Sequence, residues 1–369
     1  MKKTLQRTLF PALLALLALL ALAACSSDAP PADTPTPTPT ETVEEATPAN
    51  VEEPSDVTIT DFDGRSVTLT PNPARVAIYD YAILDILYNI GFENTGIQQL
   101  IVPSKDTLPD ALEYYKNQGD DKVLTGGTLF YVDWDVLDLV QPELVILGGR
   151  SFGMNASGER LGREENEKFR TDTEERYNQT VFAKLSVGAG DAALLTDMER
   201  NIAALSAIFP AASDELEAKF EEIKSEIAAI HAKVEASGKN ALFAMMVDQT
   251  TLSVFLPSSR FDMLYEEFGF ASAASEAVEW TDQHGFDVRA EYVLEVDPDV
   301  IFLLDRSATV GTGAGAENFI NDPIIARTRA AVAGDIYVLT GDAWYTMTGG
   351  FSAAEAMISD ISQYIEKLD

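Results

Sequence analysis

Short apolar segments typical of buried β-strands alternate with segments of helical spacing through both halves of this chain. RVAIYD (75–80) is followed by the helical YAILDILYNIG (81–91), and VDWDVLDLVQPELVILGG (132–149) predicts a helix and then a strand. The alternation resumes at NALFAMMV (240–247) and ends with a predicted helix in SAAEAMISDISQYIEKL (352–368). Such alternation indicates a parallel sheet that is covered by helices on both faces. The sequence therefore predicts an α/β fold.

Two segments of similar design, one in each half, indicate that this architecture occurs twice. LDLVQPELVILGGR (137–150) and VLEVDPDVIFLLDR (293–306) both read as a helix, a proline, a strand and an arginine. Internal similarity of this kind is expected when two units share one architecture. We therefore expect two similarly built, Rossmann-like α/β lobes.

A long amphipathic segment separates the two halves. Its apolar residues advance by four and three positions and form one narrow seam: Leu216, Phe220, Ile223, Ile227, Ile230 and Val234. Ser213 or Asp214 is a candidate N-cap, and Gly238 is a candidate C-terminal stop. At 1.5 Å per residue the helix would be on the order of 35 Å long, enough to join two lobes. We predict an N-terminal lobe at 57–212, a single connecting helix at 213–237 and a C-terminal lobe at 238–369.

The first 24 residues have the features of a signal peptide. Lys2, Lys3 and Arg7 precede the stretch LFPALLALLALLALAA, which is too short to be a stable membrane span. The residues before Cys25 resemble a bacterial lipobox, in which this cysteine becomes the lipidated N-terminus. The alternative is an ordinary secretory signal with an incidental cysteine. Cys25 is the only cysteine, so an intrachain disulfide is impossible.

Residues 25–56 continue from this cysteine as a linker rich in proline, threonine and acid. A segment with so little to bury should remain extended and disordered. We therefore expect the folded part to be held by a lipid anchor on the extracytoplasmic face of the cell membrane.

The acidity of the chain restricts its partners. Its formal net charge is −34, and residues 1–24 contain three basic residues and no acid, so the mature form is more negative still. Such a surface argues against binding to nucleic acid and against lying flat on anionic lipid. An anionic ligand can bind only where the local field opposes the global one, which makes any cluster of arginines informative.

Three arginines each follow a predicted strand. Arg150 follows LVILGG, Arg260 follows LSVFLPSS, and Arg306 follows VIFLLD. In a parallel α/β sheet the carboxyl ends of the strands line the ligand crevice, and guanidinium groups bind oxygen-rich anions through forked hydrogen bonds. We therefore predict a small positive pocket made by these side chains. The alternative is that each arginine pairs with an acid at its strand end, as Arg306 could with Asp305.

Two further residues are candidate ligands for iron. Tyr345, in DAWYTMTGG (342–350), follows another predicted strand, and His284, in TDQHGFDV (281–288), is one of only two histidines. A phenol and an imidazole suit Fe(III). Because a permanent metal site usually has more than two protein ligands, a chelator would supply the remainder, and we expect no permanent cofactor.

The sequence gives little sign of the common catalytic motifs. It contains no GxxxxGK[ST] and no HExxH, and GTGAGAE (311–317) lacks the lysine of a phosphate-binding loop. GRSFG (149–153) has the spacing GxSxG, but a motif this short is not by itself evidence of a catalytic serine. With 60 acidic residues in the chain, a pair of carboxylates carries no information. We therefore do not expect an enzyme.

From Val57 to the C-terminus the chain resembles the iron-siderophore substrate-binding lipoproteins of ABC importers, in particular the catecholate-type receptors such as the enterochelin and petrobactin binders. The resemblance rests on five short motifs in the order and approximate spacing of that subgroup: LGGRSF, LPSSRFDML, QHGFDV, LLDRS and AWYTMTGG. It implies two α/β lobes joined by one long helix, with the ligand in the cleft between them. It also implies delivery of a ferric siderophore to a permease and its ATPase. We expect the receptor to be a monomer.

The resemblance gives each candidate residue a role. The anionic ferric-catecholate centre would be faced by Arg150, Arg260 and Arg306. His284 and Tyr345 would complete the coordination of iron when a tetradentate siderophore leaves two positions open, and would not ligate the iron of a hexadentate one. Glu266, in the predicted helix RFDMLYEEFG (260–269), would contact the permease from the C-terminal lobe.

One segment departs from the pattern of the subgroup. Residues 151–180 are longer and more charged than expected, and they predict a solvated surface excursion that could also cover the mouth of the cleft and change the size of the ligand. Haem or cobalamin binding by the same fold remains an alternative. A lipid-anchored exported enzyme and a stalked adhesin are weaker alternatives, because neither a catalytic constellation nor repeats are found.

Overall fold

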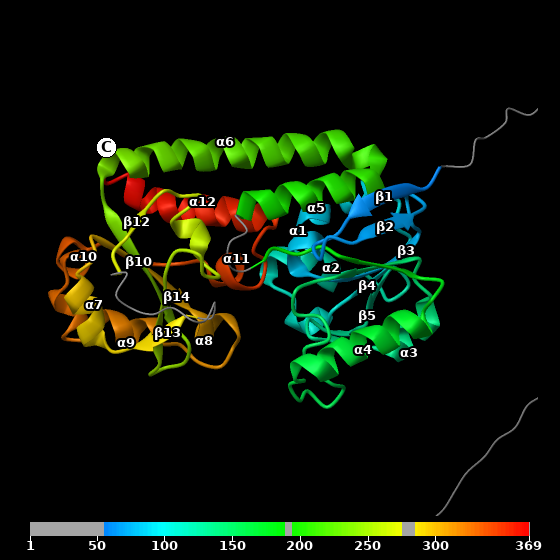
Figure 1. The fold of residues 1–369 in the computed structure, drawn as a ribbon, viewed down its shortest axis with the longest axis horizontal. Helices are drawn as coiled ribbons and strands as arrows, with labels where there is room; N and C mark the ends of the chain where they lie inside the picture. Colours follow the sequence, from blue (N-terminus) through cyan, green and yellow to red (C-terminus); the bar gives the residue numbers. More distant parts are fainter. Residues whose placement is uncertain (1–54, 189–193, 275–284, 369) are drawn as a thin grey trace, which may run out of the picture. The chain divides into compact units, whose positions relative to one another are not determined.

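The computed structural model describes residues 55–188, 194–274 and 285–368 (Figure 1). The predicted signal peptide, the lipidation site Cys25, almost all of the predicted linker and the candidate iron ligand His284 lie outside the described residues. No described helix combines the length and the apolar character that crossing a bilayer requires.

The first sheet has five parallel strands in the spatial order β5-β4-β3-β8-β9. Its strands are β3 (Arg75–Tyr79), β4 (Gln99–Val102), β5 (Val123–Thr125), β8 (Leu144–Leu147) and β9 (Val181–Lys184). Its helices are α1 (Tyr81–Asn89), α2 (Glu113–Lys116), α3 (Trp134–Val140) and α4 (Arg163–Arg176). Sequential parallel strands need crossover connections, and these helices provide most of them.

Helices cover both faces of this sheet. Successive side chains of a strand point to opposite faces, and both sets are buried here. Val76 and Ile78 of β3 belong to the core that includes α1. Ala77 and Tyr79, the alternate residues, belong to a separate core with Leu137 of α3. Figure 1 shows α1 on one side of the sheet and α3 and α4 on the other. The predicted parallel sheet with two covered faces is therefore confirmed in this half.

The second sheet is mixed rather than wholly parallel. Its strands are β10 (Asn240–Met246), β11 (Leu252–Phe255), β12 (Ala271–Ser272), β13 (Phe286–Val288), β14 (Val300–Asp305) and β15 (Ile336–Val338). β12 and β14 pair parallel with β10, and β15 pairs parallel with β14, whereas β11 runs antiparallel to both β10 and β13. Only a short turn joins β10 to β11, in which Asp248 accepts hydrogen bonds from the backbone of Thr250 and Thr251 at 2.7 and 2.8 Å. A turn of this length can join only antiparallel neighbours.

Apart from the C-terminal helix α12 (Phe351–Ile365), the described helices of this half are short. They are α7 (Ala290–Val296), α8 (Arg306–Thr309), α9 (Ala316–Ile320), α10 (Arg329–Ala333) and α11 (Gly341–Tyr345). The helix predicted at 260–269 is wrong: only a 3₁₀ turn forms there, at Asp262–Leu264. The apolar residues around it, from Phe261 to Phe268, are buried without a helical stripe. Tertiary packing, and not helical periodicity, therefore determines the backbone conformation of residues 260–269.

Two antiparallel hairpins complete the first half. β1 (Val57–Thr60) pairs with β2 (Ser66–Leu69) around Asp63 and Gly64. β6 (Gly127–Thr128) pairs with β7 (Tyr131–Val132). The charged segment 151–180 forms α4, whose side chains are mostly exposed, although Phe169 packs against Phe152 with ring centroids 5.0 Å apart.

The longest described helix, α6 (Ser213–Ser237), lies between the two sheets in the sequence. All six residues of the predicted apolar seam are buried. Gly238 ends the helix in the left-handed conformation with φ of 62°, as expected for a glycine stop. The predicted N-cap is wrong, since Ala212 occupies the cap position without a side-chain hydrogen bond. Together with the two sheets, this helix confirms the predicted fold class.

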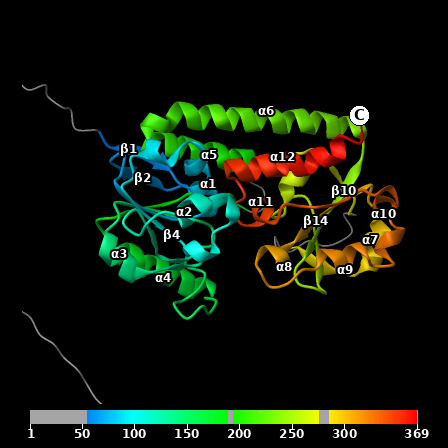
Figure 2. The same cartoon turned by 180° about the vertical axis from the view of Figure 1, so that it is seen from behind.

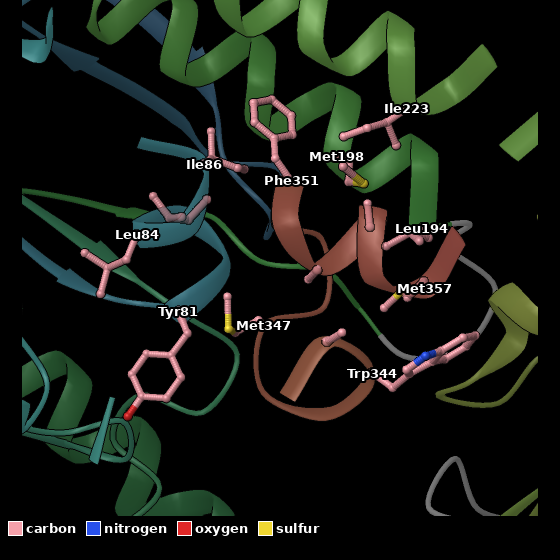
Figure 3. Close-up of a cluster of buried hydrophobic side chains, with 14 of the residues drawn as sticks. Tyr81, Leu84, Ile86, Leu194, Met198, Ile223, Trp344, Met347, Phe351 and Met357 are labelled. Atoms are coloured by element: carbon pink, nitrogen blue, oxygen red, sulfur yellow. The ribbon is translucent and has the colours of Figure 1, made fainter. Parts of the chain in front are cut away.

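Two other helices pack against α6. In both views α5 (Leu194–Ile208) and α12 (Phe351–Ile365) lie beside it (Figures 1 and 2). Figure 3 shows side chains from α1, α5, α6 and α12 gathered in one buried cluster with Trp344 of α11. The C-terminal helix therefore packs against elements of the first half as well as the second. The lobe boundaries stated above stay predictions.

Two buried carboxyl groups tie distant elements together. Asp85 of α1 accepts a hydrogen bond of 2.8 Å from the backbone N–H of Ser352, in the first turn of α12. Glu267 accepts one of 3.3 Å from the backbone N–H of Leu195, in the first turn of α5. Burial raises the pKa of Asp85 to about 6 and that of Glu267 to about 7, although these hydrogen bonds act in the opposite direction.

These raised pKa values predict that the folded protein is more stable at pH 5 than at pH 8. The folded state holds protons on Asp85 and Glu267 at pH values where the unfolded chain has released them, so the free energy of unfolding falls as the pH rises from about 4 to about 7. We expect a difference on the order of 2 kcal/mol, or about 3 °C in the thermal midpoint. Thermal unfolding at constant ionic strength measures it. Glu267→Gln should reduce the difference, and an equal or higher midpoint at pH 8 contradicts the prediction.

Candidate functional site

The three predicted arginines are positioned by loops that follow strands of both sheets. Arg150 follows the end of β8 at Leu147 after two glycines, Gly148 and Gly149, and Arg306 directly follows β14. Arg260 follows β11, which runs antiparallel to β10, so the strand-end rule for parallel sheets does not account for its position. The loop 256–259 brings it to the same place as the others.

All three guanidinium groups surround Tyr345, the last residue of α11. The backbone oxygen of Tyr345 accepts hydrogen bonds from Arg150 at 2.5 Å and from Arg260 at 2.7 Å. Its phenol oxygen accepts a hydrogen bond of 2.9 Å from Nε of Arg306. The guanidinium carbons lie 5.3, 4.2 and 5.6 Å from the centre of its ring for Arg150, Arg260 and Arg306 respectively. One tyrosine therefore connects cations from both halves of the chain.

Close approach of these groups changes their pKa values. Burial and the repulsion of Arg150 lower the pKa of Arg260 to about 10. Burial also lowers the pKa of Arg150. Burial alone would raise the pKa of the Tyr345 phenol, but the hydrogen bond from Arg306 and the charges of all three arginines outweigh it, so this pKa lies below its ordinary value. The site is therefore a concentrated positive charge that favours a phenolate.

No carboxylate among the described residues forms a salt bridge with Arg150, Arg260 or Arg306. The pairing of Arg306 with Asp305, the alternative considered above, does not occur. The carboxylate of Asp305 instead accepts hydrogen bonds from backbone N–H groups of its own loop, those of Ala308, Gly315 and Ala316. Within the described part of the chain, no salt bridge neutralises the positive charge of the three arginines.

A cavity of about 420 Å³ opens beside these groups. Arg150, Arg260 and Tyr345 line it, whereas Arg306 does not. Besides its hydrogen bond to the phenol of Tyr345, Arg306 donates a second one, of 3.1 Å, to the backbone oxygen of Val247. A cavity of this size suits a small molecule. Because its lining comes from both halves of the chain, a ligand here would contact both.

The cavity has further lining residues that the sequence reasoning missed. Asp80 directly follows β3, and Lys184 is the last residue of β9, so both obey the strand-end rule that identified Arg150. Burial raises the pKa of Asp80 to about 6, against hydrogen bonds from Ile83 and Ala82 and the charge of Arg150. Lys184 is paired with Asp63 at 2.9 Å, and its Nζ lies 4.6 Å from the ring centre of Phe62.

The remaining candidates are only partly tested by the geometry. His284 lies outside the described residues, so its position relative to Tyr345 stays a prediction. Glu266 is exposed, next to the buried Glu267. Among the described residues, no group of three or more histidine, cysteine, aspartate and glutamate side chains is arranged to hold a metal ion.

Two sheets flanked by helices, the long helix α6 between them in the sequence and a cationic cavity lined from both halves define a two-lobed binding protein. The chain belongs to the periplasmic binding protein family, which it matches over residues 76–343. It is similar to the petrobactin-binding protein YclQ of Bacillus subtilis, with 24% identity over 312 residues that cover 83% of this chain and 87% of the relative. It is also similar to the ferric-anguibactin-binding protein FatB of Vibrio anguillarum, with 22% identity over 294 residues, 79% of this chain and 83% of the relative.

A solved structure has the same fold. The periplasmic catecholate-siderophore binding protein VctP of Vibrio cholerae superimposes with a TM-score of 0.69 and 24% identity, covering 84% of this chain and all of VctP. The expectation of a binding-protein family with two α/β lobes is therefore confirmed.

Proposed function

We propose that this protein is an extracytoplasmic receptor that binds an anionic ferric siderophore, of the catecholate type, and delivers it to an ABC importer. The observation that carries the proposal is the convergence of Arg150, Arg260 and Arg306 on Tyr345 beside a cavity, without a carboxylate partner among the described residues. On a chain of net charge −34, such a site has one evident use, which is to neutralise an anion.

Charge neutralisation at this site is strong because the arginines are partly buried. Coulomb interactions are weakened less by a protein interior than by water. A guanidinium group also offers a planar fork of donors that matches the oxygen atoms of a catecholate. Binding would therefore relieve the mutual repulsion of the three cations and add directed hydrogen bonds.

The names of the relatives support this ligand class. YclQ is a petrobactin-binding protein and FatB is a ferric-anguibactin-binding protein, and both match most of the length of this chain. Haem or cobalamin binding is the alternative within the fold, and a lipid-anchored enzyme is a weaker one. We further propose that no covalent reaction is catalysed.

Tyr345 and His284 would ligate iron directly when the siderophore is tetradentate. The lowered pKa of Tyr345 favours the phenolate, which is the form that binds Fe(III). A tetradentate ligand leaves two of six coordination positions for protein side chains, whereas a hexadentate one leaves none. The iron is cargo here and belongs to no permanent site.

The cellular setting is proposed from the sequence. Cys25 would carry the lipid anchor on the extracytoplasmic face of the cell membrane, and residues 26–56 would serve as the tether. The exposed Glu266 would contact the permease, and its ATPase would drive import. The receptor would act as a monomer.

Titration with a panel of tetradentate and hexadentate ferric catecholates tests the function. We expect quenching of tryptophan fluorescence at sub-micromolar concentration, since Trp344 is adjacent to Tyr345. Tyr345→Phe and His284→Ala should weaken binding of tetradentate complexes and shift their charge-transfer band, with little change for hexadentate ones. Equal effects on both sets would refute direct ligation. Binding of none of the complexes, or a Soret or corrinoid spectrum on loading with haem or cobalamin instead, would refute the siderophore proposal.

A further inference from the structure

A second cavity, of about 580 Å³, adjoins the cationic one. Leu129 and Thr346 line both, so the two cavities meet at these residues. Like the first cavity, the second is lined from both halves of the chain. A ligand that fills the cationic cavity can therefore extend into its neighbour without leaving the protein.

The lining of this second cavity is largely apolar. The loops and helix of the first half contribute Tyr81, Leu108, Pro109, Leu129, Phe130 and Met154. Tyr81, Leu108 and Leu129 are themselves buried, so this wall is a continuation of the core. The opposite side is formed by Val310, at the end of α8, with Thr309 and Gly311. Val310 is 39% exposed, an uncovered apolar side chain next to an apolar cavity.

The charge of the second cavity is opposite to that of the first. Among the described residues that line it there is no lysine, arginine or histidine, whereas Asp110 and Asp342 contribute carboxylates. Asp110 is paired with Lys116 at 3.2 Å and is exposed. Asp342 accepts a hydrogen bond of 2.8 Å from the hydroxyl of Thr346, and its charge adds to the effect of burial in raising the pKa of Tyr81. An anionic group would therefore be repelled from the wall that Asp342 and Tyr81 form.

We propose that the second cavity is a subsite for an apolar arm of the siderophore that carries no anionic group, with Val310 and Asp342 as the residues that select it. This inference rests on the proposed function, because the iron centre must occupy the cationic cavity for the arm to reach its neighbour. Apolar contact with Leu129, Phe130 and Val310 would hold the arm, and Asp342 would exclude carboxylate-bearing ones. The ligand would thus be divided into an anionic chelating part and a neutral or cationic apolar part, each matched to one cavity.

Two ferric bis-catecholamides that differ only in the linker test this proposal. One has a plain five-carbon linker and the other has the same linker with a carboxylate on its central carbon. We expect the wild-type protein to bind the plain complex at least tenfold more tightly. Val310→Asp should lower the affinity for the plain complex about tenfold, because it places a charge against the apolar arm. Val310→Lys should raise the affinity for the carboxylate complex, because its ammonium group opposes the charge of Asp342.

Val332 provides matched controls. This valine of α10 is 78% exposed and lines neither cavity, so Val332→Asp and Val332→Lys change the net charge equally without altering the subsite. They should leave the ratio of the two affinities within twofold of the wild-type value. If both complexes bind the wild-type protein equally and the Val310 variants behave like the Val332 variants, the subsite is overturned while the siderophore function stands. If neither complex binds the wild-type protein, the proposed function itself fails, and the subsite with it.

Discussion

Arg260→Ala is expected to weaken the binding of a ferric bis-catecholate by about 100-fold. Arg260 has the shortest distance to the Tyr345 ring of the three arginines, lines the cavity, and has no carboxylate partner among the described residues. Truncating one partner of a buried, hydrogen-bonded charge pair typically costs 2–5 kcal/mol, and each 1.4 kcal/mol is about tenfold in affinity. Isothermal titration or fluorescence quenching measures the change.

The same substitution is expected to stabilise the ligand-free protein. Burial and the nearby charge of Arg150 lower the pKa of Arg260, so keeping its guanidinium charged in the empty site costs free energy. Removing it should raise the thermal midpoint while binding is lost, a combination that misfolding cannot produce. Arg260→Lys keeps the charge but not the fork of donors. Its affinity for the siderophore should therefore lie between those of the wild-type protein and Arg260→Ala.

Arg327, which is exposed and lines neither cavity, is the matched control for Arg260. Arg327→Ala should leave the affinity within twofold of the wild-type value, because a change of one unit in a net charge of −34 has little effect at a distance. If Arg260→Ala also binds within threefold of wild type, the arginine cluster is not the anion site.

Trp344→Ala is expected to lower the free energy of unfolding by about 3–5 kcal/mol, the usual range for deleting a buried tryptophan. The Trp344 side chain is fully buried, and its ring lies 5.8 Å from that of Phe243 and 6.0 Å from that of Phe268. Its Nε1–H donates a hydrogen bond of 2.9 Å to Asp360 of α12, so the substitution also leaves a buried carboxyl group without this donor. Figure 3 places it at the edge of the cluster shared by both halves.

Urea unfolding followed by circular dichroism measures this loss. Trp344→Phe keeps an aromatic ring but lacks the N–H, and it should cost less than the alanine variant, about 1–3 kcal/mol. Trp344→Ala should weaken siderophore binding as well, because Trp344 holds the neighbouring Tyr345 in place. A loss of less than 1 kcal/mol in Trp344→Ala would show that α11 is not anchored by this residue.

Much of the fold follows from local patterns in the sequence. The seam from Leu216 to Val234 is buried as its spacing predicts, because a helix removes one apolar stripe from water only by packing it against other elements. The strands β3, β8, β10 and β14 also form where their apolar character predicts. Failures arise where local preference competes with packing, as at the 3₁₀ turn Asp262–Leu264, whose buried neighbours override the helical pattern.

By itself the sequence determined which residues could form the site, since strand ends that carry Arg150 and Arg306 are recognisable without knowing how the sheets are arranged. Arg260 was selected by a rule that its antiparallel strand does not obey, and only the loop after β11 brings it to Tyr345. The convergence on one tyrosine, the lack of carboxylate partners among the described residues and the apolar cavity beside Val310 depend on contacts between residues up to 195 positions apart. Such contacts leave no local pattern, because long-range packing and not the neighbouring sequence decides which side chains meet.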